Sequence, residues 1–114
     1  MDYQEQPVRT LPIENGLRIS IVGPVHTNVA WLDNELKKVS VQKPKIVELD
    51  LGQMTFLSSI GIGSFVSFRN EIVKNGGSIK TVAVQKPVFN ILKFAGLHYL
   101  LNVDAQTQVL PASH

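Results

Sequence analysis

Two short runs that contain several apolar residues open the chain, and they predict β-strands over residues 8–13 and 17–22. The residues between these two runs read Glu-Asn-Gly. Asn-Gly readily takes positive φ at both central positions of a type I′ turn, whose twist matches that of the flanking strands. We therefore expect an antiparallel hairpin. Because Pro12 cannot donate a ladder hydrogen bond, the first strand should lie at the sheet edge or be bulged there.

Three later stretches carry apolar residues at helical spacing instead. Each follows a pair suited to a helix start: Thr-Asn at 27–28, Ser-Ser at 58–59 and Lys-Pro at 86–87. The second and third stretches end at the glycines at 76 and 96, which suit a left-handed helix stop. The positions expected to face a sheet are Val29, Leu32, Leu36 and Val39 in the first helix, Ile62, Phe65, Val66, Ile72 and Val73 in the second, and Val88, Ile91, Leu92 and Ala95 in the third.

Short apolar runs at 45–51, 78–84 and 99–103 separate or follow these helices and predict three further strands. A hairpin followed by alternating helices and strands implies an α/β fold. The sheet should be mixed, because the hairpin is antiparallel whereas helical crossovers join parallel strands. The helices are expected to pack on this sheet.

A chain of 114 residues fits one domain that can bury a core without disulfides. We assign residues 8–104 to this domain, residues 1–7 to a flexible N-terminus and residues 105–114 to a C-terminal tail. No internal repeat or linker divides the chain.

Composition narrows the function classes. The chain has no cysteine, which excludes thiol catalysis and cysteine-ligated metal sites, and its formal charge of +2 does not call for nucleic acid. The start of the chain does not read as a signal peptide, and no apolar run approaches the roughly 20 residues that span a bilayer. We expect a cytoplasmic protein without membrane insertion.

The junction between the third predicted strand and the second helix presents two hydroxyls, Ser58 and Ser59, followed by Gly61 and Gly63. A serine at a helix start accepts a hydrogen bond from a backbone N–H that has no partner within the helix. Glycines just beyond it allow another backbone or a partner to approach closely. From the local chemistry alone, two serines that cap a helix are the simplest explanation.

This junction resembles a family signature. Residues 50–63 read Asp-Leu-Gly-Gln-Met-Thr-Phe-Leu-Ser-Ser-Ile-Gly-Ile-Gly, which is similar to the Asp-Leu-Ser-Gly-Val-Thr-Phe-Met-Asp-Ser-Ser-Gly-Leu-Gly run of STAS domains, in particular of anti-sigma-factor antagonists. The Asn-Gly-Gly turn at 75–77 and the helix end at 88–97 also resemble the family. The resemblance implies the same mixed α/β fold.

It also implies a function. In the family the first serine after the acid is phosphorylated, and that position falls on Ser59, with Ser58 as the fallback acceptor. The implied partner is an anti-sigma factor with a histidine-kinase-type ATPase fold, and partner switching would free a sigma factor. The implied partner-binding residues are Ser58, Ser59, Ile60, Gly61, Gly63 and His26.

The chain departs from the family pattern at three places. Ser58 replaces the acid before the acceptor, and Ile60 replaces the second serine or threonine. Residues 23–26 read Gly-Pro-Val-His where the family often has Gly-Glu-Leu-Asp. These changes favour an alternative function, a STAS scaffold or cytosolic subunit of a signalling or transport complex that is not phosphorylated. Self-association stays open.

A serine hydrolase is a third hypothesis, with Ser58 or Ser59 as nucleophile, His26 or His98 as base and Asp50 behind it. The motif lacks the Gly-x-Ser-x-Gly pattern of such enzymes. The Gly-Ile-Gly at 61–63 lacks the rest of a phosphate-binding loop, and three scattered histidines have no metal-ligand spacing. We therefore predict a binding protein that is not an enzyme and needs no cofactor or metal.

Overall fold

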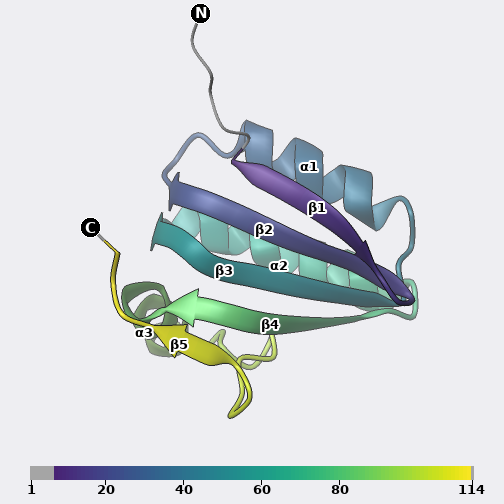
Figure 1. Cartoon of the computed structure of the whole chain (residues 1–114). Helices are drawn as coiled ribbons and strands as arrows, with labels where there is room; N and C mark the ends of the chain where they lie inside the picture. The colour runs from purple at the N-terminus through teal and green to yellow at the C-terminus, as the bar shows by residue number, and fades with distance from the viewer. Residues whose placement is uncertain (1–6, 114) are drawn as a thin grey trace, which may run out of the picture.

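The computed structural model describes residues 7–113. The predicted flexible N-terminus, residues 1–7, lies outside this range apart from Pro7. The chain alternates strands and helices after an opening pair of strands (Figure 1). The elements are β1 (Val8–Ile13), β2 (Gly16–Val25), α1 (Ala30–Ser40), β3 (Ile46–Leu57), α2 (Ser59–Lys74), β4 (Ser78–Gln85), α3 (Lys86–Phe94) and β5 (Gln108–Leu110).

The five strands form one mixed sheet in the order β1-β2-β3-β4-β5. β1 and β2 are antiparallel, and every other neighbouring pair is parallel. The three helices lie behind the sheet in Figure 1, so that one sheet face is covered and the other is open. This arrangement follows from the right-handed crossovers between parallel strands that are next to one another. The predicted fold class is confirmed.

The hairpin is confirmed as well. Ile13 pairs with Gly16, so the loop consists of residues 14 and 15, and only Asn15, with φ of 64°, has positive φ. The expected type I′ turn with Asn15 and Gly16 at its centre is therefore wrong. A side chain at Gly16 would collide with the Ile46 carbonyl of β3, which explains the glycine. β1 is the edge strand in which Pro12 was expected.

The helices begin and end close to their predicted bounds, and most of the predicted apolar positions face the core. Three details differ. α1 has Val29 as its N-cap, and Asn28 Oδ1 accepts only a 3.4 Å hydrogen bond from the first amide of the helix. In α2 the buried positions continue through Phe68, whereas Val73 is 43% exposed and its predicted burial is wrong. Ala95 is exposed too, because α3 ends one residue before it.

The strand predicted over residues 99–103 is wrong, because these residues form turns. Polar side chains in and after this segment donate hydrogen bonds to β4 carbonyls, in place of the backbone hydrogen bonds that a paired strand would make. Asn102 donates from Nδ2 to the Ile79 carbonyl at 2.6 Å, and Thr107 donates from its hydroxyl to the Thr81 carbonyl at 2.7 Å. The Thr81 hydroxyl in turn donates to the Leu101 carbonyl at 2.8 Å. The first half of β4 therefore has its edge covered without a paired strand.

The last strand, β5, lies within the segment that the sequence assigned to a tail. It pairs with residues 83–85 of β4. The Gln85 side chain, which is only 2% exposed, holds the end of this segment. Its amide nitrogen donates to the Gly52 carbonyl and to the Ser113 hydroxyl, both at 2.9 Å, and its oxygen accepts from Ser113 N at 3.2 Å.

We predict that Gln85→Ala lowers the free energy of unfolding by about 2 kcal/mol, because it leaves a small cavity and unpaired polar groups in a buried place. Urea denaturation followed by circular dichroism measures this change. The matched control is Gln42→Ala, which removes an exposed amide that donates to the Lys38 carbonyl. It should change stability by less than about 0.5 kcal/mol. Equal effects of the two substitutions would contradict the assignment.

Candidate partner-binding site

The hydroxyl of Ser58 joins the start of α2 to the end of β2. Ser58 is the N-cap of α2, and its Oγ accepts a hydrogen bond from Gly61 N at 3.0 Å. The same oxygen donates to the His26 carbonyl at 2.6 Å, and Ser58 N donates to the Val25 carbonyl at 2.9 Å. A hydroxyl has one proton to donate, and here that proton is already used.

Ser59, the first residue of α2, is in a different situation. It is exposed, and its hydroxyl makes no hydrogen bond with any residue of the described range 7–113. The first turn of α2 contains no acid, and its amides carry the positive end of the helix dipole. Of the two predicted acceptors, Ser59 is thus the accessible one and Ser58 the structural one.

The two glycines of the motif have different surroundings. A methyl group added to Gly61 would lie 2.6 Å from Val25 Cγ1 and 2.8 Å from Leu57 Cδ1, so the glycine allows α2 to start close against β2 and β3. Gly61 is buried, so it does not itself lie at the surface beside Ser59. Gly63 is exposed, with no atom within 4 Å of an added methyl group.

The other predicted partner-binding residues lie on the same end of the sheet. Ile60 is 50% exposed, and His26 is exposed with its ring centroid 5.4 Å from that of Phe56. Phe56 is itself 43% exposed at the end of β3. The structure therefore presents Ser59, Ile60 and His26 at the surface around the start of α2.

An apolar groove next to Ser59 was not predicted. It has a volume of about 440 Å³ and lies between the start of α2 and the end of α3. Phe94, which is 96% exposed, is its most prominent side chain. The residues that line it are Ser59, Ile62, Asn90, Ile91, Phe94 and Ala95. The one feature of the sequence that could have indicated this groove is Phe94, an aromatic residue outside the buried stripe of α3.

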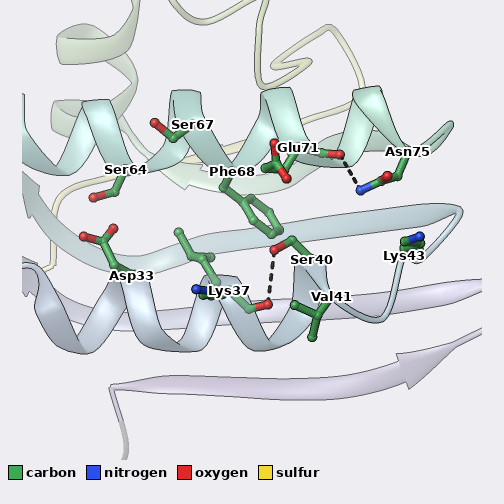
Figure 2. Close-up of a pocket in the computed structure, with 11 residues that line it drawn as sticks. Asp33, Lys37, Ser40, Val41, Lys43, Ser64, Ser67, Phe68, Glu71 and Asn75 are labelled. Atoms are coloured by element: carbon green, nitrogen blue, oxygen red, sulfur yellow. Dashed lines mark hydrogen bonds between the residues drawn. The ribbon is translucent and has the colours of Figure 1, made fainter.

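A second hollow, of about 490 Å³, lies between α1 and α2 (Figure 2). Leu36 and Phe68 give it an apolar part, and Figure 2 shows Phe68 pointing into the space between the helices. Its charged side chains are of both signs, with Asp33 and Glu71 as well as Lys37. Three serines but no histidine line it, so it does not provide a hydroxyl beside a base.

The residues of the hydrolase hypothesis do not form a relay in residues 7–113. Ser58 donates to the backbone of His26 and not to its ring. The His98 ring makes an edge contact with Tyr99, and Asp50 accepts from Gly52 N. The same part of the chain holds no group of three or more potential metal ligands, and none of its helices is long and apolar enough to cross a membrane.

The described residues form a small α/β domain with an exposed serine at a strand-to-helix junction. The family model of the STAS domain matches residues 12–109. The chain therefore belongs to the STAS domain family, as the resemblance implied.

The similar proteins carry related names. An anti-sigma-B factor antagonist of Bacillus subtilis (strain 168) is 21% identical over 95 residues, which are 83% of this chain and 87% of that protein. A crystal structure of an anti-sigma factor antagonist from Mycobacterium paratuberculosis has a TM-score of 0.70 at 18% identity, over 96% of this chain and 90% of the other. The anti-sigma factor antagonist SpoIIAA in its unphosphorylated form has a TM-score of 0.65 at 16% identity, over 94% and 89%. At these identities the structural matches show the shared fold.

The glycine pair gives a first prediction for this site. Gly61→Ala should lower the free energy of unfolding by about 1–3 kcal/mol, because the added methyl group forces Val25 and Leu57 to move. Gly63→Ala, two residues along the same helix, should raise it by about 0.5–1 kcal/mol through better helix propensity. Thermal and urea unfolding of both variants test this. Destabilisation by Gly63→Ala as large as that by Gly61→Ala would contradict it.

The two serines should also differ in stability. Ser58→Ala removes an N-cap and leaves the His26 carbonyl without its donor, which should cost about 1–2 kcal/mol. Ser59→Ala should change the free energy of unfolding by less than about 0.5 kcal/mol, because its hydroxyl is exposed. Denaturant titrations of the two variants in the same buffer measure both changes. A larger loss of stability in Ser59→Ala than in Ser58→Ala would contradict the assignment of Ser58 as the structural serine.

Proposed function

We propose that this protein is an anti-sigma factor antagonist that binds an anti-sigma factor with a histidine-kinase-type ATPase fold. Binding would free a sigma factor, and phosphorylation of Ser59 by that partner would end the interaction. The protein acts in this scheme as a regulatory binding protein and not as an enzyme. The names of its relatives support the partner class.

The observation that carries the proposal is the difference between the two hydroxyls. Ser58 uses its proton in a 2.6 Å hydrogen bond, whereas Ser59 is exposed at the surface where α2 starts. A kinase needs a hydroxyl that can enter its active site and attack the γ-phosphate of ATP. The exposure of Ser59 at the first position of α2 supports this role. A third structural neighbour, the Bacillus cell fate determinant SpoIIAA in the phosphorylated form, has a TM-score of 0.59 at 14% identity and agrees with such chemistry in the family.

Phosphorylation would change the interface and leave the fold intact. A phosphoserine carries about −1.5 to −2 charges at neutral pH. At residue 59 this charge meets the positive end of the 16-residue helix α2, which is a favourable place for an anion. A partner shaped for a neutral hydroxyl would lose contacts there. A loss of about 3 kcal/mol weakens binding roughly 100-fold, which is enough to exchange partners.

The replacement of the family's acid by Ser58 supports a second candidate, a STAS scaffold that binds its partner without phosphorylation. Both candidates use the same surface. They differ in whether Ser59 is modified, and this difference can be measured directly.

We expect that incubation with the ATPase-fold anti-sigma factors of the source organism and ATP adds one phosphate, measured by intact mass. Ser59→Ala should abolish the addition, and Ser64→Ala, a serine on the same helix, should not. Binding of the phosphorylated protein to the same anti-sigma factor should be about 100-fold weaker than that of the unmodified protein in calorimetry. An unmodified chain that still binds supports the scaffold, and a phosphate on Ser58 would transfer the acceptor role to that residue.

A further inference from the structure

We infer that the partner segment which docks beside Ser59 is acidic, presenting carboxylates next to an apolar side chain that packs on Phe94. This inference rests on the proposed function and specifies the chemistry of its partner. It comes from the charge and the apolar area of the surface formed by the start of α2, the length of α3 and the ends of β2 and β3. We call this surface the docking face.

The docking face contains no carboxylate. None of the nine Asp and Glu residues of the chain lies at the end of β2 (residues 23–25), at the end of β3 (55–57), in the first turn of α2 (59–62) or in α3 (86–94). α3 contains Lys86 and Lys93. A surface with cations and no acids on an otherwise nearly neutral protein attracts a partner of negative charge and repels a basic one.

The two lysines lie on α3 next to Asn90, and neither of them is among the residues that line the apolar groove. Their Nζ atoms are 5.7 and 5.9 Å from the centroid of the Phe89 ring, Lys86 and Lys93 respectively, within the distance of a cation–π contact. Asn90, which lines the groove, is four residues after Lys86 and three before Lys93, so the three side chains are neighbours on the helix surface. A carboxylate of a docked segment can therefore reach a lysine while its apolar neighbour enters the groove.

Phe94 provides the apolar part of the contact. It is 96% exposed, and the groove beside it is completed by Ile62, Ile91 and Ala95. Large aromatic side chains bury much area at little entropic cost, and a few such anchors dominate the energy of most interfaces. An aromatic residue this exposed, next to isoleucines, indicates a surface that is covered when the protein acts.

The acidic partner also explains how a phosphate at Ser59 would act. Ser59 lines the same groove as Phe94. A dianion there would repel the partner's carboxylates across a short distance, in addition to the space it occupies. The charge of the docking face would change from cationic to nearly neutral, since a phosphate of about −2 would offset its two lysines.

The test uses calorimetry with the unphosphorylated protein and the anti-sigma factor that modifies Ser59. Lys93→Glu should weaken binding about tenfold, and Phe94→Ala about 30-fold. The matched controls are Lys74→Glu, the same charge change at the exposed far end of α2, and Leu11→Ala, an apolar side chain that is 56% exposed on β1. Both controls should bind within about twofold of the wild type. Raising NaCl from about 50 to about 500 mM should weaken the wild type more than Lys93→Glu.

The outcomes separate this inference from the proposed function. If the wild type binds and is phosphorylated while Lys93→Glu and Phe94→Ala bind as well as their controls, the inference is wrong and the proposed function stands. If no anti-sigma factor binds or modifies the wild type, both fail. If sedimentation shows that the wild type is a dimer which Phe94→Ala dissociates, the groove is occupied by a second copy and the acidic partner is excluded.

Discussion

Three hydrogen bonds at Ser58 fix the position of α2 relative to the sheet. The backbone amide of Ser58 donates to Val25, its hydroxyl donates to His26, and Gly61 N donates to that hydroxyl. They connect the end of β2 with the first turn of the helix that follows β3. Gly61 has no side chain, which allows the first turn of α2 to lie close against β2 and β3. Ser59 lies between the cap and this glycine, and it is exposed.

The hairpin and the start of α2 could be predicted because they depend on local chemistry. Asn15 takes a positive φ in the turn, although Gly16 does not, and Ser58 caps α2 as serines do. The strand expected at 99–103 failed for a non-local reason. Its apolar residues have the pattern of a strand, but Asn102 and Thr107 satisfy the β4 carbonyls through their side chains. That pairing depends on which loop folds against the edge, which a local pattern does not contain.

In the candidate site, too, one part could be predicted from the sequence and another part depends on non-local packing. The position of Ser59 followed from the resemblance to the STAS motif, whereas the groove beside it did not. The groove exists because α3 stops where it does: Gly96 has φ of 74°, and Leu97 N donates back to the Leu92 carbonyl. This stop leaves Phe94 in the last turn of α3 and outside its buried stripe, next to α2. Only the packing of two helices that are distant in sequence reveals that Phe94 and Ser59 share one surface.

A serine in place of an acid at position 58 affects both the stability of the junction between β3 and α2 and the charge of that junction. A carboxylate there could accept from Gly61 N as well as a hydroxyl does, but it could not donate to the His26 carbonyl. The hydroxyl therefore adds a bond between α2 and β2 that an ionised acid cannot make. It also leaves the docking face without a negative charge beside Ser59. A chain with this arrangement keeps the STAS fold, and its unmodified surface favours carboxylates where an acid at position 58 would repel them.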